Sequence, residues 1–160
     1  MYIRFAKPED ITAITQIEWD SFGRGVATKR ETYEEKFVRQ AEHFLIAEES
    51  NQIIGFIEGL ASNQRTIEDE MFRNAETHNP DGEWEMIISL AVSEDAQGKG
   101  VGKQLLKKLI EQARQRKQKG VVLTCKESLI PYYQAFGFVD EGVSDSVLGG
   151  VKWYDMRLEF

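Results

Sequence analysis

The segment Met86-Ile87-Ile88-Ser89-Leu90-Ala91-Val92 leads through a short polar turn into Gln97-Gly98-Lys99-Gly100-Val101-Gly102, and this stretch decides the fold. Its first part is a continuous apolar run, which is typical of a buried strand. After the glycines, apolar residues recur at helical spacing as far as Gln118, which predicts a helix with its polar face in water. These apolar residues are Val101, Leu105, Leu106, Leu109, Ile110 and Ala113.

The glycines at 98, 100 and 102 give the turn a chemical character. Glycine accepts positive φ and lets backbone N–H groups approach a ligand without a Cβ in the way. A helix N-terminus adds unpaired N–H donors and a positive dipole end, which favour phosphate oxygens. A Walker A loop and a dinucleotide fingerprint both fail on the spacing, because Gln97, Lys103 and Gln104 stand where those motifs need other residues. From the glycines alone, a flexible turn and a pyrophosphate site both stay open.

Length, charge and cysteine content limit the class of protein. A chain of 160 residues fits a single domain over 1–160. The net charge of −7 argues against nucleic-acid and anionic-membrane partners, which require clustered Lys and Arg. Cys125 is the only cysteine, so no intramolecular disulfide can form and a reducing compartment is expected. No apolar run is long enough for a signal peptide or a membrane span, which predicts a cytoplasmic protein.

The first half of the chain predicts strands and helices in mixed order. We expect a strand over 2–5, a helix from Pro8 to Phe22, a second helix over 32–40, and a hairpin of strands 44–47 and 53–57. In the second helix, Tyr33, Phe37 and Val38 are expected on the buried side. Residues 62–82 have no sustained apolar period, apart from a possible helical turn at Met71-Phe72, and predict a surface excursion near the site rather than core.

The second half alternates strands and helices. We expect a buried strand over 121–124, a short helix capped by Ser128 and running to Ala135, and last strands over 138–139 and 151–160 around a Gly149-Gly150 turn. The fold class is therefore α/β or α+β. Its central sheet is mixed and mostly antiparallel, with about 6–7 strands and helices on both faces.

The glycine turn resembles the coenzyme A loop of the GNAT acyltransferase superfamily, whose pattern is Arg or Gln, two residues, Gly, one residue, then Gly or Ala. Here the pattern is Gln97-x-x-Gly100-x-Gly102. The resemblance implies acetyl-CoA as co-substrate, no metal, and a GNAT-like sheet. It implies that backbone amides from Gln97 through Gly98, Lys99, Gly100, Val101 and Gly102 to Lys103 hold the pyrophosphate, and that the strand end lines the pantetheine through Leu90, Ala91 and Val92.

A second block, from Leu123 to Phe138, resembles another part of the same superfamily and matches its arylalkylamine N-acetyltransferase branch most closely. In that branch a tyrosine before an aromatic-Gly-Phe turn reaches the coenzyme sulfur, and the position corresponds to Tyr133. Neighbouring helix residues point about 100° apart, so Tyr132 and Tyr133 cannot both face the sulfur. The other interpretation of Tyr133 is a buried aromatic with its hydroxyl satisfied.

The resemblance to the arylalkylamine branch also implies an acceptor pocket. Its residues would be Phe22 at the end of the first helix, and Leu148, Val151 and Trp153 in the C-terminal run. Core packing is the alternative for Phe22 and Trp153. That branch has two histidines on its central strand for removing the amine proton, whereas this chain has Met86 and Ile88 there.

The general base is therefore open. An amine with a pKa near 10 is only ~0.1% neutral at pH 7, so its proton must be removed or its pKa depressed. Glu18, Glu83 and Glu85 are candidates, and none is assigned. A solvated or satisfied imidazole is the favoured interpretation for both His43 and His78.

Two other features favour plain structural interpretations. A lone cysteine is usually a small buried hydrophobe, which disfavours Cys125 as an acyl-carrying nucleophile. The acidic run Glu68-Asp69-Glu70 is interpreted as a solvated face, and no metal-ligand spacing is present.

The combined hypothesis is an N-acetyltransferase that moves an acetyl group from acetyl-CoA to a small-molecule primary amine by direct attack in one ternary complex. A non-catalytic acyl-CoA sensor or partner-binding module is the alternative of another class, and a protein amino group is the alternative acceptor. A homodimer is expected only from the family resemblance.

Overall fold

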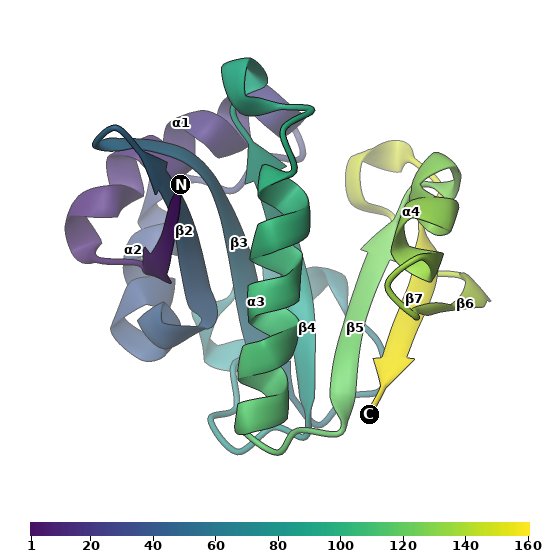
Figure 1. Ribbon diagram of the computed structural model, residues 1–160. Helices are drawn as coiled ribbons and strands as arrows, with labels where there is room; N and C mark the ends of the chain where they lie inside the picture. The colour runs from purple at the N-terminus through teal and green to yellow at the C-terminus, as the bar shows by residue number, and fades with distance from the viewer.

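The computed structural model describes residues 1–160 and contains one seven-stranded sheet. Its strands are β1 (Tyr2–Phe5), β2 (Phe44–Glu49), β3 (Gln52–Ser62), β4 (Trp84–Val92), β5 (Gly120–Cys125), β6 (Val139–Val143) and β7 (Tyr154–Glu159). They are arranged in the order β1-β2-β3-β4-β5-β7-β6. Every neighbouring pair is antiparallel except β4 and β5, which run parallel. The predicted mixed, mostly antiparallel sheet is confirmed (Figure 1).

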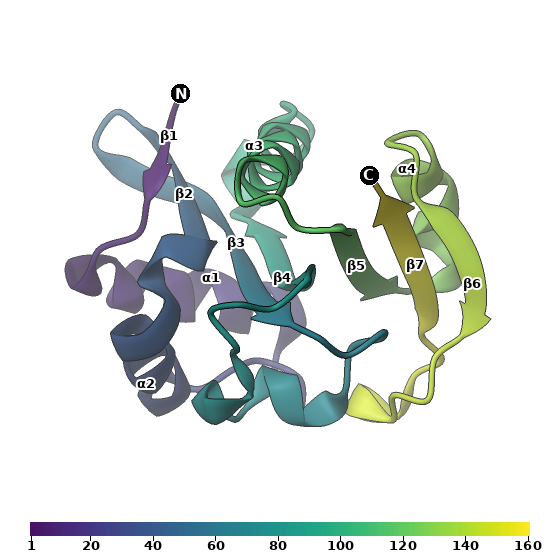
Figure 2. The same ribbon diagram turned by 90° about the horizontal axis from the view of Figure 1, so that it is seen from below.

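Helices cover both faces of this sheet, as predicted. They are α1 (Ile11–Phe22), α2 (Arg30–Gln40), α3 (Val101–Gln115) and α4 (Ile130–Gln134). Seen along the sheet, α3 lies on one face and α1 and α2 lie on the other (Figure 2). None of these helices combines the length and the apolar character that crossing a membrane requires.

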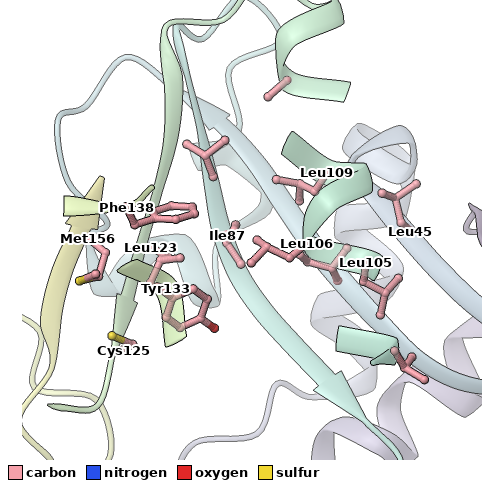
Figure 3. Packing of buried hydrophobic residues seen from close by; sticks show 14 of the residues in the cluster. Leu45, Ile87, Leu105, Leu106, Leu109, Leu123, Cys125, Tyr133, Phe138 and Met156 are labelled. Atoms are coloured by element: carbon pink, nitrogen blue, oxygen red, sulfur yellow. The ribbon is translucent and has the colours of Figure 1, made fainter. Parts of the chain in front are cut away.

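The core beneath α3 follows directly from the helical spacing of its apolar residues. Leu105, Leu106 and Leu109 are buried against the sheet together with Tyr133 and Phe138 (Figure 3). Burying one such leucine side chain contributes about 1.5–3 kcal/mol. The long amphipathic helix predicted after the glycine turn is therefore confirmed, and it fixes the glycine turn at the end of β4.

The core beneath α1 and α2 contains a buried charge that the sequence pattern did not predict. Val38 was expected on the buried side of α2, but it is 87% exposed. Lys36 is fully buried instead, because residues 33, 36, 37 and 40 form one stripe of the helix and residue 38 lies about 100° away from 37. Its ammonium forms an ion pair with Glu58 on β3 and donates a hydrogen bond to the Met71 carbonyl at 3.0 Å.

Residues 62–82 were expected on the surface, and this expectation is wrong in part. Ile67, Met71 and Ala75 are buried, and the first two pack with Leu60 and Met86 in a third small core. The segment folds as two 3₁₀ turns, Asp69–Phe72 and Ala75–Thr77. Short turns of this kind bring apolar residues inward at irregular intervals, so no single period appears in the sequence.

Two C-terminal boundaries also differ from the expectation. The last strand begins at Tyr154 rather than at 151, because positive φ angles at Gly149 and Gly150 bend the chain before it. Ser128 does not cap a helix. It lies inside a 3₁₀ turn, Glu127–Leu129, which runs into α4 without a side-chain cap.

The parallel pair β4 and β5 separates soon after it forms. Only Trp84, Glu85 and Met86 pair with β5, opposite Gly120, Val121 and Val122. The rest of β4, up to Val92, has no strand neighbour on that side. The register of β4 with β3 also shifts between Glu58 and Gly59, which leaves Ile88 as an extra residue in β4, a β-bulge.

We expect Lys36→Met to destabilise the fold by about 3–5 kcal/mol, because it leaves the Glu58 carboxylate buried without its cation. Urea denaturation measures the loss. Arg39→Met on the exposed face of α2 is the matched control, with an expected change within about 0.5 kcal/mol. Equal losses in the two variants would contradict the structural role of the buried pair.

Candidate functional site

A cavity of about 300 Å³ lies where β4 and β5 separate. Its walls come from β4, β5, the end of α1, α4 and the chain before β7. The lining is mainly apolar, and it brings together predicted site residues that lie far apart in the sequence: Phe22, Leu90, Tyr133, Leu148, Val151 and Trp153. A concave, mostly apolar cavity of this size is typical of a small-molecule site.

The three predicted strand residues have different surroundings. Leu90 lines the cavity, and Val92 packs on the α3 face. The side chain of Ala91 is buried in the opposite core, beneath α1 and α2, so it offers the cavity side only its backbone. Ser93 N–H donates to Ile54 on β3 at 2.8 Å. Because successive residues of a strand point their N–H groups to opposite sides, Val92 N–H points away from β3, toward the open side of β4.

The glycine turn presents a row of free backbone donors. The N–H groups of residues 98–103 make no hydrogen bond within the protein, and the first hydrogen bond of α3 is Gln104 N–H to Gly100 O. Gly98 and Gly100 have φ of 79° and 82°, a conformation that L side chains rarely adopt. Lys99 and Lys103 are exposed beside them. These donors at a helix N-terminus form an arrangement suited to a phosphate.

Gln97 differs from the other predicted loop residues. Its backbone N–H already donates to Glu94 O at 3.3 Å, so its amide is not free for a ligand. Its side-chain Nε2 donates to Val92 O at 3.0 Å. The glutamine therefore ties the loop to the end of β4.

Tyr133 and Tyr132 point in different directions, as the helical geometry required. Tyr133 is 8% exposed, lines the cavity, and points its hydroxyl away from β5 (Figure 3). Burial raises the pKa of its phenol well above the usual value, so the hydroxyl keeps its proton. Tyr132 is 39% exposed, and its hydroxyl lies 3.9 Å from the position that a Cβ on Gly102 would occupy.

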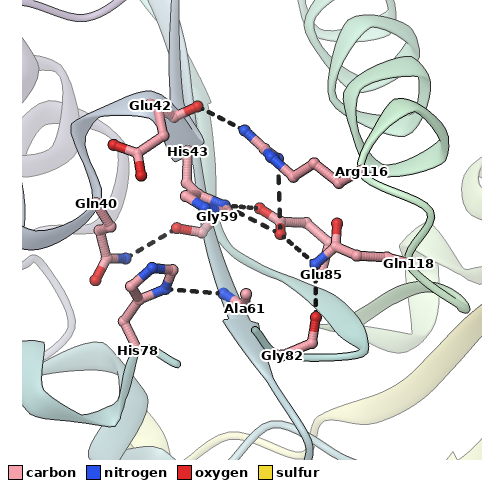
Figure 4. A network of polar contacts seen from close by, with 10 residues as sticks. All are labelled: Gln40, Glu42, His43, Gly59, Ala61, His78, Gly82, Glu85, Arg116 and Gln118. Carbon is pink, nitrogen blue, oxygen red and sulfur yellow. Dashed lines mark hydrogen bonds and ion pairs between the residues drawn. The ribbon is translucent and has the colours of Figure 1, made fainter. Parts of the chain in front are cut away.

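Only one of the three candidate bases reaches the cavity. Glu18 lines it. Glu83 is exposed and forms an ion pair with Lys119 at 2.9 Å. Glu85 is buried elsewhere, where it accepts hydrogen bonds from His43 and Gln118 (Figure 4).

The two histidines belong to that same polar network and lie outside the cavity lining. His43 Nδ1 contacts Glu85 at 2.8 Å, and Ala61 N–H donates to His78 Nδ1 at 3.1 Å (Figure 4). Burial lowers the pKa of His78 to about 4, so its ring is neutral. Glu42, His43 and His78 lie close enough together to suggest a metal site. Since Nδ1 of His78 accepts a hydrogen bond, its ring proton is on Nε2, so His78 has no free lone pair for a metal.

Cavity residues that the sequence did not single out include Ser89 and Phe72. The bulge at Ile88 explains Ser89. Ile87 and Leu90 both pack on the α3 face, so the two residues between them turn to the opposite face, and Ser89 Oγ reaches Glu18 on α1. No feature of the sequence marks this bulge.

Asp69 holds the cavity wall in place. Its carboxylate accepts hydrogen bonds from Ser146 Oγ and from Val147 N–H, the latter at 3.0 Å. The acidic run was expected to be a solvated face, but this member of it joins the segment before β4 to the loop that contains Leu148.

Comparison with known proteins finds one matching family and several similar structures. Residues 11–138 match the acetyltransferase (GNAT) family. The chain resembles ribosomal-protein-alanine N-acetyltransferase from Brucella melitensis, with a TM-score of 0.76, 21% identity and 100% of both chains covered. It also resembles the loading GNATL domain of CurA from Lyngbya majuscula, with a TM-score of 0.83, 13% identity and 99% and 96% covered. A third match is yncA from Salmonella typhimurium, solved with its cofactor acetyl-CoA, with a TM-score of 0.73, 22% identity and 99% and 93% covered. At these identities the structural matches show a shared fold.

We expect Gly100→Ala to weaken coenzyme A binding at least about tenfold, because a Cβ at this φ costs roughly 1–2 kcal/mol and moves the free amides. Isothermal titration with coenzyme A measures the change. Gly142→Ala is the matched control, since Gly142 also has a positive φ with open space around it but lies in β6. An unchanged affinity in Gly100→Ala would exclude the loop as the anion site.

Proposed function

Because the chain belongs to the acetyltransferase (GNAT) family and is an enzyme of that class, we propose that it transfers an acetyl group from acetyl-CoA directly to a small primary amine. Both substrates would be bound in one ternary complex. The observation on which this proposal rests is the placement of the free amides of residues 98–103 and of the Tyr133 cavity along the same unpaired side of β4.

The unpaired donors provide the proposed coenzyme site. The amides of Gly98 to Lys103 would hold the pyrophosphate, with Lys99 and Lys103 adding positive charge. The open side of β4 would hydrogen-bond the pantetheine through the backbone of Leu90 to Val92, much as another strand would. Gln97 contributes through its side chain, which holds Val92 O.

The apolar cavity provides the proposed acceptor site. Phe22, Leu148, Val151 and Trp153 would surround the apolar body of a small amine. The block from Leu123 to Phe138 supports the arylalkylamine-like branch, and the cavity volume of about 300 Å³ suits a small molecule. Because ribosomal-protein acetyltransferases are among the structural matches, a protein amino group stays the competing acceptor for this chain.

The proposed chemistry uses two groups of this chain, the Val92 N–H and the Tyr133 hydroxyl. The neutral amine attacks the thioester carbonyl carbon, and Val92 N–H donates to the oxygen on which negative charge develops. The C–S bond then breaks, and its electron pair goes to sulfur. Tyr133 donates its proton to the departing thiolate and takes back the extra proton of the new amide nitrogen, so the phenol is regenerated.

Two further hypotheses from the sequence are a non-catalytic acyl-CoA sensor and a homodimer. Membership of an acetyltransferase family favours catalysis over a non-catalytic acyl-CoA sensor. The homodimer stays a prediction from the family resemblance.

We expect Tyr133→Phe to lower kcat by about 10²-fold, because the departing thiolate loses its proton donor. Thiol release from acetyl-CoA measures turnover, and titration should show unchanged coenzyme A affinity. Tyr132→Phe, which removes a hydroxyl that lies outside the cavity lining, should change kcat less than about threefold. Equal kcat values for wild type and Tyr133→Phe would remove the assigned role.

Cys125 is not expected to form an acyl-enzyme. It is buried, and burial raises the pKa of its thiol to about 11, so little thiolate exists at neutral pH. Cys125→Ala should keep kcat within about threefold of wild type, with initial-rate patterns that remain sequential. A loss of turnover together with a stable fold would instead indicate a covalent route.

A further inference from the structure

Glu18 is the one acidic side chain that lines the acceptor cavity, and it is only 3% exposed. It extends from α1 toward the bulged part of β4. Ser89 Oγ donates to its Oε1 at 2.7 Å, and Thr28 N–H donates to its Oε2 at 2.9 Å. Both contacts are donors to the carboxylate oxygens, so they fix its position and still leave lone pairs for a ligand. The buried hydroxyl of Tyr33 also lies beside this carboxylate.

No cation of the protein neutralises Glu18. It takes part in none of the ion pairs of the chain. Lys126, the only basic residue that lines the cavity, is exposed and lies beyond ion-pair distance. A buried carboxylate without a cation is costly, because burial removes the water that stabilises its charge.

The neighbouring buried charges do not balance it either. Lys36 is the nearby buried cation, and it is already engaged by Glu58 and the Met71 carbonyl. Glu58 lies directly opposite Ser89 in the β3–β4 register. Burial raises the pKa of Glu58 to about 6, Lys36 acts against that rise, and the nearby carboxylate of Glu18 adds to it. With both ionised, the cluster of Glu18, Glu58 and Lys36 has one surplus negative charge.

Most of the other residues that line the cavity are apolar, and they include the aromatic residues Phe22, Phe72 and Trp153. A ligand that complements both features has one positive charge and a compact apolar body. A primary ammonium group on a compact apolar molecule has both properties. A ligand with a neutral or anionic head group would leave the surplus negative charge of the Glu18, Glu58 and Lys36 cluster unpaired.

We propose that Glu18 binds the ammonium form of the acceptor and takes its proton, with Ser89 and the Thr28 amide as positioning groups. This inference rests on the proposed acetyl transfer to an amine. An N–H bond of the ammonium breaks and its electron pair stays on nitrogen, while the proton forms an O–H bond with Glu18 and later leaves to water. Glu18 thereby accepts the amine proton, which the side chains of Met86 and Ile88 cannot do.

The binding half of the proposal is tested without turnover. The coenzyme A complex is titrated with 2-phenylethylamine and with its neutral isostere 2-phenylethanol. Wild type should prefer the amine at least about 30-fold, since removing one partner of a buried charge pair costs 2 kcal/mol or more. Glu18→Gln, which keeps a hydrogen-bond acceptor and the side-chain shape, should abolish the preference. A preference that survives in Glu18→Gln would overturn the ammonium site.

The proton-transfer half is tested with two nucleophiles at pH 7. Glu18→Gln should lower kcat for 2-phenylethylamine by about 10²-fold. It should change kcat for phenylhydrazine, which is already largely neutral, by less than about threefold. Equal losses for the two nucleophiles would overturn the proton-acceptor role.

Two controls separate this inference from the proposed function. Glu83→Gln makes the same charge change outside the cavity and should alter neither preference nor turnover, and the melting temperature and coenzyme A affinity of each variant show that it is folded. Absence of thiol release by wild type with every amine would overturn the proposed acetyl transfer, while the binding preference would still decide whether Glu18 is an ammonium site.

Discussion

The separation of β4 from β5 is the constraint on which the rest of this structure depends. A parallel pair that continued to the end of β4 would use the backbone groups of both strands and close the space between them. Here only three register pairs form, from Trp84 to Met86. The remaining backbone of β4 faces an opening that side chains from α1, α4 and the C-terminal loop surround. Both proposed substrate sites follow from this unpaired side.

The core between the sheet and helices α1 and α2 contains three buried charged side chains. Lys36, Glu58 and Glu18 lie in a region that otherwise packs aromatic and aliphatic side chains. Burying charge lowers stability unless each group finds a partner. Lys36 and Glu58 have each other, and Glu18 faces the cavity. This region is therefore both part of the core and the wall from which the proposed ammonium site extends.

Loop geometry then sets the shape of the cavity. Trp153 Nε1 donates to Leu148 O at 2.8 Å, and Asp69 holds the preceding residues 146 and 147. These bonds connect segments that are far apart in sequence. They give an irregular loop a fixed conformation, which is what a selective small-molecule site requires.

The sequence by itself determined the sheet class, the glycine turn at the start of α3, and the apolar stripe of that helix, because these depend on local spacing and on the conformational freedom of glycine. It also marked Tyr133, Phe22, Leu148, Val151 and Trp153 through motif resemblance, and the structure gathers them in one cavity. Only the tertiary structure decided which of the three candidate carboxylates faces that cavity. The bulge at Ile88 turns Ser89 toward α1, and the burial of Lys36 against Glu58 leaves Glu18 without a cation. Bulges and buried ion pairs arise from contacts between distant strands and helices, so no local pattern in the sequence encodes them.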